Sequence, residues 1–359
     1  MKTYALHGLR ICSQMPLDAP EIDSGDPDVN IVIGSTRPVG NEVPSGTLIS
    51  HIDEDPPSNG YEPNSTLRRL VSVVENRDGY SMTYHGLAQL FISRDLRDVT
   101  VVLEPGSAQD VVSTIVGAGL GGMLVTVAGA FSNSTLPLLS GQTTQPAISG
   151  DVALHASAVC IGRRAIAFAG CSGSGKSTLA AMACASTDSV TLLTDDTLRV
   201  HVEEPRAWCY PGSSSVRLRP ATTGLAGRFG QHNLRQTGDG RTAVELGRND
   251  TKIDTKADPL AAIPLISVIL PGYKPEASGF QLDKLPATEA LIALLGMGRL
   301  ANPTDPSIVS THFAACASLV RSIPVYSVAL ADNYWASEAS SGELIRAITQ
   351  ELLLETVGS

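Results

Sequence analysis

Short apolar runs separated by turn residues mark out the first third of the chain. Alternating or continuous apolar patterns predict strands at 3–12, 29–33, 80–84, 89–93 and 98–103. Apart from the run at 29–33, residues 17–63 are rich in Pro, Gly, Asp and Ser, a composition typical of loops. These patterns predict a small β-rich domain of the α+β class, with a sheet that we expect to be antiparallel.

A long uncharged segment follows this region. No charged residue and no histidine occurs from Val111 through Gly150, and residues 111–131 are apolar over a length that would cross a bilayer. Five glycines interrupt that stretch, and no basic residue flanks it, because Asp110 precedes it and Asp151 is the next charge. The pattern favours a buried helix, with a membrane contact as the alternative. Residues 132–150, rich in Ser, Thr, Gly and Pro, are expected to form a linker.

Strand and helix patterns alternate beyond the linker, which predicts a second domain over 151–359 after an N-terminal domain over 1–131. The predicted strands are 153–161, 164–169, 189–194, 264–270 and 323–330, and the predicted helices are 178–185, 288–300 and 342–357. This alternation predicts a parallel sheet. Residues 222–256 are polar and contain several glycines, and we expect them to form loops near a functional site.

One stretch of the second domain fits a phosphate-binding pattern. Residues 170–177, Gly-Cys-Ser-Gly-Ser-Gly-Lys-Ser, match G-x-x-x-x-G-K-S/T at every fixed position, after a strand pattern and before a run of helix formers. In such a loop, backbone N–H groups turn inward around a phosphate chain, and the helix N-terminus adds partial positive charge. Lys176 is expected to reach the β- and γ-phosphates of ATP or GTP, and Ser177 to offer its hydroxyl to Mg²⁺. The candidate nucleotide-binding residues are Gly170, Ser172, Gly173, Ser174, Gly175, Lys176, Ser177 and Thr178.

Two adjacent carboxylates, Asp195 and Asp196, end the predicted strand at 189–194. Because they follow Lys176 by about one helix and one strand, we expect their strand to end at the same edge of the sheet as the glycine loop. One carboxylate can hold Mg²⁺ while the other accepts the proton of an attacking hydroxyl, the two functions that phosphoryl transfer needs. The sequence does not assign these roles between the two residues, and a simple strand-end turn is the alternative.

Composition limits the partners and the compartment. The 359 residues are enough for two domains, each with a substantial core. A formal net charge of -10 and a pI near 5.2 give the chain no overall attraction to nucleic acid or to anionic lipid. The six cysteines form no C-x-x-C pair, and the N-terminus lacks the apolar core of a secretion signal. We expect a cytoplasmic protein, able to form homo-oligomers, whose partner is a small molecule, a peptide or a protein.

Three segments resemble the HPr kinase/phosphorylase superfamily, which has a phosphoenolpyruvate-carboxykinase-like fold. They are Leu154–Val159, Ala167–Ala180 and Leu192–Asp196, and they are most similar to the HPr-kinase-related tailoring kinases of lasso-peptide biosynthesis. Weaker similarity at Tyr4–Ile11 and Arg321–Tyr326 extends the resemblance over most of the chain. The resemblance implies an α/β P-loop kinase domain that transfers phosphate, with ATP and Mg²⁺, to a serine hydroxyl of a peptide such as a lasso-peptide precursor.

The same resemblance implies roles for individual residues. Lys176 and Ser177 take the loop roles, Asp195 and Asp196 act as metal ligand and base, and His155 lies beside the transferring phosphoryl group. A His at the end of a neighbouring strand can donate a hydrogen bond to a γ-phosphate oxygen, although a buried core histidine is the alternative. Residues 210–219 replace the signature segment of the bacterial HPr kinases, so neither HPr as substrate nor phosphorylase activity is expected.

Other side chains are candidates of lower specificity. Arg217 and Arg219 occupy alternate positions, so that one of them can face the site and bind phosphate or a substrate carboxylate, and structural salt bridges are the alternative. Lys252 is a weaker candidate of the same type. Cys171, inside the glycine loop, is either a thiol with a lowered pKa or a small filler side chain.

Two other functions compete with the peptide kinase. One is a kinase for a small-molecule hydroxyl, and the other is a nucleotide-binding regulator without a dedicated acceptor. For the peptide kinase, we expect the N-terminal domain both to cover the apolar segment and to recognise the substrate. Short edge strands of its sheet would accept an extended peptide by strand addition, and substitutions on the strands over 80–103 would weaken peptide phosphorylation.

Overall fold

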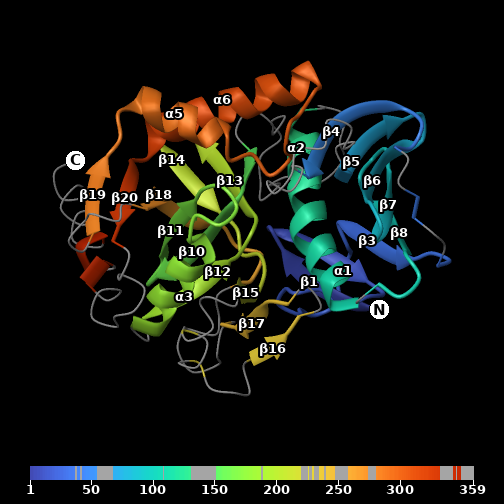
Figure 1. The fold of residues 1–359 in the computed structure, drawn as a ribbon, viewed down its shortest axis with the longest axis horizontal. Helices are drawn as coiled ribbons and strands as arrows, with labels where there is room; N and C mark the ends of the chain where they lie inside the picture. Colours follow the sequence, from blue (N-terminus) through green and yellow to red (C-terminus); the bar gives the residue numbers. More distant parts are fainter. Residues whose placement is uncertain are drawn as a thin grey trace, which may run out of the picture.

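The computed structural model describes residues 1–36, 39–40, 43–54, 68–107, 109–130, 151–186, 189–219, 234–237, 240–246, 258–273 and 280–331, with a few further positions at 225, 229, 343–344 and 346–348. These residues form a mixed α/β fold with two large β-sheets, which lie on either side of helix α2 (Gly121–Ala130) (Figure 1). The predicted linker at 132–150 and Lys252 lie outside the described residues.

The N-terminal sheet has eight strands in the order β1-β2-β3-β8-β7-β6-β5-β4. They are β1 (Lys2–Leu6), β2 (Leu9–Ser13), β3 (Val29–Ile33), β4 (Thr47–Glu54), β5 (Arg68–Asn76), β6 (Gly79–Tyr84), β7 (Ala88–Ser93) and β8 (Asp98–Leu103). Most neighbours are antiparallel, but β3 is parallel to both β2 and β8. The expectation of an antiparallel sheet is therefore wrong around β3, where long connections return the chain in the same direction.

Three strands of this sheet differ from the sequence prediction. The run at 3–12 forms two strands, because the chain turns at His7 and Gly8, whose φ angles are 55° and 76°. Neither β4 nor β5 was predicted, and β4 lies in the region expected to be loop. Each carries a buried serine, Ser50 in β4 and Ser72 in β5, so the polar residues of these strands do not mark their solvent face.

The strands over 80–103 cannot accept a peptide by strand addition. The strands β6, β7 and β8 are each paired on both sides, so they offer no free edge to a peptide. At the outer strand β1, the Ala5 N–H donates to the Pro20 carbonyl over 2.9 Å. At the other outer strand, β4, the carbonyl of Ile49 accepts from the Thr304 N–H over 2.9 Å. Both outer strands are thus engaged by other parts of the chain.

The apolar segment forms a buried helix, as predicted, but the helix is not continuous. It consists of α1 (Gln109–Ile115), the π-helical turn η1 (Val116–Leu120) and α2 (Gly121–Ala130). Most of α2 is buried between the two sheets, because apolar side chains cover all of its faces. In the part of the chain that the structure describes, no helix combines the length and the apolar character needed to cross a membrane.

The second sheet has nine strands, of which seven follow the order β12-β10-β11-β18-β14-β13-β9, while β20 lies against β18 and β19. They are β9 (Asp151–Leu154), β10 (Ala156–Ile161), β11 (Arg164–Ala169), β12 (Val190–Thr194), β13 (Leu198–Glu203), β14 (Arg206–Cys209), β18 (Ile263–Tyr273), β19 (Phe280–Lys284) and β20 (Val325–Leu330). Only the pairs β11–β18 and β18–β20 are parallel among those described.

The predicted parallel sheet is therefore wrong, and hairpins explain why. A tight turn at Gly162 and Arg163 joins β10 to β11, so these sequence neighbours pair antiparallel. The run predicted as one strand at 153–161 breaks at His155 into β9 and β10, which have different neighbours. A one-residue break is invisible in the apolar pattern, because the residues on both sides of it are buried.

Helices cover both faces of this sheet. Helix α3 (Lys176–Ser186) packs on one face against Val159, Ile166 and Phe168, and α5 (Ala287–Leu295) and α6 (Pro306–Ser322) cover the alternate side chains on the other face (Figure 1). The predicted helix at 288–300 ends at Leu295, and α6 was not predicted. The start of α6 is marked in the sequence by Asp305 followed by Pro306, a pair typical of a helix N-terminus. In the structure, Asp305 accepts hydrogen bonds from the N–H groups of Ser307 and Ile308.

A small third sheet has two of its three strands in the region expected to be loops. It has the order β15-β17-β16, from β15 (Ser215–Leu218), β17 (Thr242–Glu245) and β16 (Leu234–Gln236). The loop prediction for 222–256 is thus wrong at β16 and β17, and most of its other residues lie outside the described ones. Of the predicted helix at 342–357, only 343–344 and 346–348 are described, and they are helical.

A buried arginine joins the two large sheets. Arg199 in β13 donates to the carbonyl of His7 and to the Asp151 carboxylate, both over 2.8 Å, and stacks on the ring of Tyr210. Burial would raise the pKa of Asp151, but Arg199 and His201 outweigh it and hold the pKa below its ordinary value. The β1–β2 turn of the N-terminal sheet is thereby fixed against the second sheet.

We expect Arg199→Leu to lower the free energy of unfolding by about 3–5 kcal/mol, because it leaves the Asp151 carboxylate buried beside a neutral side chain. Urea unfolding measures the loss. Exposed Arg163→Ala is the control and should change stability by less than about 0.5 kcal/mol. The loss should be complete above the ordinary pKa of Asp151 and shrink as the pH falls through the lowered one. A loss under about 1 kcal/mol would mean that the Arg199–Asp151 pair contributes no more to stability than an exposed surface ion pair, which contradicts the prediction.

Candidate functional site

The glycine loop lies between β11 and α3, in the order strand, loop, helix that the sequence predicts. Gly173 and Gly175 have φ angles of 88° and 95°, where other residues are strained, so the backbone turns tightly at both. Lys176 is buried, and its Nζ donates to the carbonyl of Cys171 over 2.8 Å. Burial lowers the pKa of Lys176, while Asp196 and Asp195 act in the opposite direction.

The two carboxylates follow β12, which lies one strand away from β11 on the far side of β10. Both β11 and β12 are antiparallel to β10, so they run in the same direction and end at the same edge of the sheet. The sequence prediction that these ends meet is therefore confirmed, although another strand separates them.

Asp195 is buried among hydroxyl and amide donors. Its Oδ1 accepts from Ser177 Oγ over 2.8 Å and from Ser157 Oγ over 2.5 Å, and its Oδ2 accepts from the Arg217 N–H over 3.2 Å. Its own N–H donates to Ser213 Oγ over 2.8 Å. These contacts hold the carboxylate directly beside the hydroxyl that ends the glycine loop.

Asp196 has a different environment, made of two cationic or ionisable side chains. Its Oδ2 accepts from Arg299 over 2.7 Å, and its Oδ1 lies 3.2 Å from Nε2 of His155. Burial would raise the pKa of Asp196, but Arg299, His155 and Arg217 outweigh it and hold the pKa well below its ordinary value. Asp196 is therefore ionised at neutral pH. His155 is partly exposed, so it is not a core histidine.

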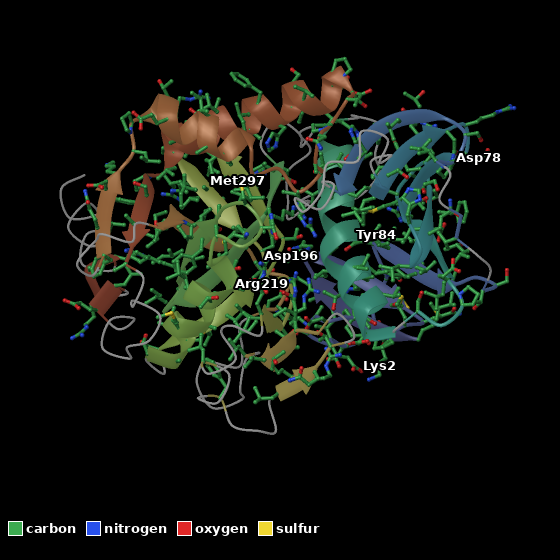
Figure 2. The ribbon with its side chains drawn as sticks, viewed as in Figure 1. Lys2, Asp78, Tyr84, Asp196, Arg219 and Met297 are labelled. Carbon is green, nitrogen blue, oxygen red and sulfur yellow. The ribbon has the colours of Figure 1, made fainter. Side chains whose placement is uncertain are left out.

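A cleft of about 990 Å³ connects the loop with both carboxylates. Its walls include residues 171–178, His155, Asp195, Asp196, Arg217 and Arg219, which were predicted, and Arg241, Arg299, Pro271, Gly272, Gly296, Gly298, Ile52 and Ala301, which were not. Gly170 lies at the start of the loop instead, where a Cβ would come within 2.5 Å of Ser174 Oγ. Asp196 and Arg219 lie near the middle of the molecule (Figure 2).

Both candidate arginines face this cleft, whereas the sequence predicted that one would. A guanidinium nitrogen of Arg219 lies 3.3 Å from Ser172 Oγ in the loop. Arg217 is close enough to Asp196 to lower the pKa of that carboxyl. Together with Lys176, Arg241 and Arg299 they give the cleft a cationic wall in a chain of net charge -10.

Sequence reasoning missed Arg299, the main ion-pair partner of Asp196. It follows α5 in the run Gly-Met-Gly-Arg, 103 positions from Asp196, and no motif marks it. Arg299 also donates from Nε to Thr197 Oγ1 over 2.8 Å, and its N–H donates to the carbonyl of Ala153 over 2.8 Å. Only the tertiary fold brings this arginine to the site.

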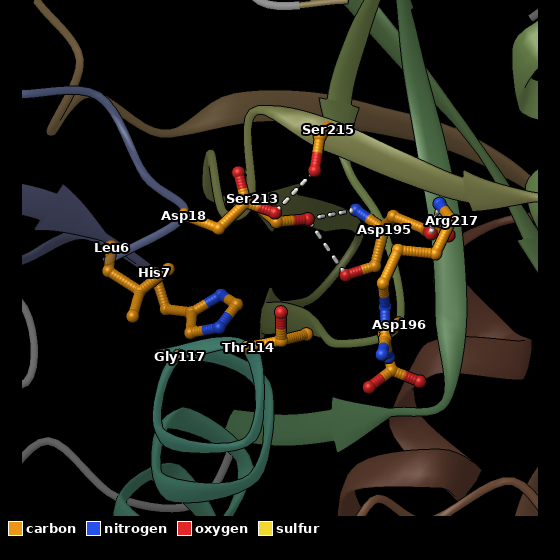
Figure 3. A pocket seen from close by; sticks show the side chains of 10 residues that line it. All are labelled: Leu6, His7, Asp18, Thr114, Gly117, Asp195, Asp196, Ser213, Ser215 and Arg217. Atoms are coloured by element: carbon orange, nitrogen blue, oxygen red, sulfur yellow. Dashed lines mark hydrogen bonds between the residues drawn. The ribbon is translucent and has the colours of Figure 1, made fainter. Parts of the chain in front are cut away.

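The β1–β2 turn and the helical segment of α1 and η1 reach the opposite side of the acidic pair. A cavity of about 10 Å³, the size of one water molecule, is lined there by Leu6, His7, Asp18, Thr114, Gly117, Asp195, Asp196, Ser213, Ser215 and Arg217 (Figure 3). His7 is buried, and neither of its ring nitrogens has a hydrogen-bond partner among the described residues. Burial, with Arg199 and Arg299 nearby, lowers the pKa of His7 to about 3, so the ring is neutral.

The sequence was compared with models of known protein families and with curated proteins, and neither comparison gives a match.

The thiols of the site and of the core should react at different rates. Cys171 is exposed in the glycine loop, whereas burial raises the pKa of Cys184 and of Cys316 to about 12. We expect iodoacetamide near pH 8 to label Cys171 well before those two, because the thiolate is the reactive form. Peptide mass spectrometry measures the order, and labelling in denaturant is the control. Equal rates in the folded protein would show that the loop thiol is shielded.

Proposed function

We propose that this protein is a P-loop kinase that transfers the γ-phosphoryl group of ATP or GTP to a serine hydroxyl of a peptide or protein. The observation that carries the proposal is the contact between Ser177 Oγ and Asp195 Oδ1, 2.8 Å long, at the end of the glycine loop. It joins the last residue of a phosphate-loop pattern to the acidic residue that such sites use for Mg²⁺.

The donor set suits Mg²⁺, which prefers oxygen ligands and keeps several waters and phosphate oxygens. Ser177 and Asp195 supply a hydroxyl and a carboxylate oxygen at one place. Among the described residues, no three His, Cys, Asp or Glu side chains are grouped to hold a metal ion by themselves, and a magnesium-nucleotide site needs no such cage. When bound, the ion neutralises charge on the β- and γ-phosphates.

The cationic residues of the cleft bind and orient the phosphates. Lys176 is the first residue of α3, where the loop amides and the helix N-terminus also favour negative charge. Its contact with the Cys171 carbonyl gives way to phosphate oxygens when the nucleotide enters. Arg217 and Arg219 extend this cationic surface and stabilise the charge of the phosphoryl group during transfer.

Asp196 receives the proton of the acceptor. The serine Oγ–H bond breaks as Oγ bonds to the γ-phosphorus, the bond to the β-phosphate oxygen breaks, and the nucleoside diphosphate leaves with that electron pair. Arg299 and His155 hold Asp196 ionised, so the carboxylate accepts a hydrogen bond from the acceptor hydroxyl and orients it. It takes the proton only as Oγ bonds to the γ-phosphorus, when that proton has become acidic enough for a weak base. Because Asp195 contacts the Ser177 hydroxyl that ends the glycine loop, we assign Asp195 to the metal ion and Asp196 to the acceptor proton.

The acceptor class rests on the resemblance of residues 154–159, 167–180 and 192–196 to the lasso-peptide tailoring kinases. On that basis we propose a ribosomally made precursor peptide as the acceptor. Ile52 of β4 lines the same cleft as the glycine loop, so the N-terminal sheet contributes to the surface that a macromolecular acceptor would meet. Transfer to a small hydroxyl compound and nucleotide binding without transfer are the outcomes that an acceptor screen distinguishes.

Lys176→Ala should lower phosphoryl transfer by about 10²–10³-fold without unfolding the protein, because it removes a fixed cation from the transferring phosphate. The measurement is ³²P transfer from labelled ATP to serine-containing precursor peptides and to a panel of small alcohols. Exposed Arg164→Ala is the control and should keep wild-type activity. If Lys176→Ala turned over at the wild-type rate, the glycine loop would not be the phosphate site.

Asp195→Asn and Asp196→Asn should fail in different ways. Asp195→Asn removes the carboxylate beside Ser177, so Mg²⁺-dependent nucleotide affinity should fall, as it should for Ser177→Ala. Asp196→Asn should keep that affinity and lose turnover by about 10²-fold or more, the usual contribution of a general base. Calorimetry with a nonhydrolysable nucleotide, with and without Mg²⁺, separates the two. The same defect in both variants would contradict the assignment.

A further inference from the structure

The junction between α1 and α2 is rich in glycine and lies directly behind the acidic pair. It runs from Gly117 in η1 to Gly122 in α2, and Gly117 and Thr114 line the small cavity together with Asp195 and Asp196 (Figure 3). Glycine disfavours a helix, because it costs up to about 1 kcal/mol relative to Ala. Its use at this buried junction therefore calls for a steric reason.

Gly122 supplies one such reason, since it is in contact with Arg299. A Cβ on Gly122 would overlap Cγ of Arg299 and would lie 3.0 Å from its Cβ. These atoms belong to the inner end of the side chain, which cannot swing aside. The Arg299 N–H is bonded to the Ala153 carbonyl, and its guanidinium is bonded to Thr197 and Asp196. The arginine therefore has its present position only if residue 122 lacks a side chain.

Gly121 has the same relation to His7. A Cβ there would overlap Cδ2 of the imidazole and would lie 2.7 Å from Nε2. His7 is fixed from the other side, because its N–H donates to the Pro211 carbonyl over 2.7 Å and its carbonyl accepts from Arg199. Two successive glycines of α2 thus fit two side chains that face Asp196 from different parts of the chain.

We propose that the α1–α2 junction is a positioning element of the transfer site, in which Gly122 provides the space that lets Arg299 hold the Asp196 carboxylate. The expected effect on turnover rests on the proposed kinase function. It assigns the N-terminal domain a part in catalysis that needs no contact with the acceptor. A shift of Arg299 by the width of a methyl group moves Asp196 away from the acceptor hydroxyl, and displacements near 1 Å cost about 10²-fold in rate.

The first test is Gly122→Ala, with Gly129→Ala as the matched control in the same helix. A Cβ on Gly129 would meet its nearest neighbours at 3.7 and 3.8 Å, an ordinary packing distance. We expect Gly122→Ala to lower kcat by about 10-fold or more with nucleotide affinity unchanged, and Gly129→Ala to keep both. Wild-type kcat in Gly122→Ala would overturn the proposal.

The second test asks whether the effect passes through Arg299. Arg299→Ala removes Cγ, which the new methyl group would overlap, and leaves only Cβ at 3.0 Å, so Gly122→Ala should lower kcat much less in that background than in the wild type. Arg299→Met keeps the inner stem, so in that background Gly122→Ala should still reduce thermal stability. If Gly122→Ala lowered kcat and thermal stability equally in the wild-type and Arg299→Ala backgrounds, the methyl group would disturb only the helix. That result would refute the proposal.

Thermal unfolding of the same variants separates this inference from the proposed function. If Gly122 accommodates Arg299, Gly122→Ala lowers Tm clearly more in the wild-type background than in the Arg299→Ala background, whether or not an acceptor is phosphorylated. Suppose that the Tm effect of Gly122→Ala depends on Arg299, but the wild-type protein neither transfers phosphate nor hydrolyses Mg-ATP. The contact between residue 122 and Arg299 would then stand, and both the kinase function and the catalytic role of the junction would be rejected. Transfer by the wild type without coupling would reject the junction's role alone.

Discussion

A guanidinium buried between two sheets has to be neutralised, and Arg199 is neutralised through groups from both sheets. The Asp151 carboxylate begins β9 and the His7 carbonyl belongs to the β1–β2 turn, so the charge is satisfied only when the two sheets are together. This contact fixes the turn, and the turn places His7 behind the acidic pair. The geometry of the proposed site therefore depends on a contact that contains none of its reacting groups.

The acidic pair shows how environment separates two chemically identical neighbours. Asp195 is surrounded by hydroxyl and amide donors, which suits a group that shares a metal ion with Ser177. Asp196 is surrounded by Arg299 and His155, which keep it charged beside an open cleft. Nothing in the dipeptide itself distinguishes these roles, because the difference comes from side chains that lie far away in the sequence.

Features encoded by contiguous residues could be predicted from the sequence. The glycine loop, its flanking strand and helix, the strand leading to Asp195 and the buried apolar segment each depend on a single run of residues. Features set by distant partners could not be predicted. Arg299 reaches Asp196 across 103 positions, β4 and β5 contain buried serines that hide their pattern, and the hairpin between β10 and β11 makes the sheet mixed rather than parallel.

The backbone at Asp196 has a consequence for how this fold can diverge. Its φ of 70° lies in the left-handed region, where Asp, Asn and Gly are tolerated and most other residues are strained. Asn and Gly are each one base change away from Asp in the genetic code. On the proposed mechanism, such a change removes the proton acceptor while the backbone and the Asp195–Ser177 pair persist. A transferring enzyme and a nucleotide-responsive switch are therefore adjacent in sequence space, and gene duplication could produce one from the other in a single step.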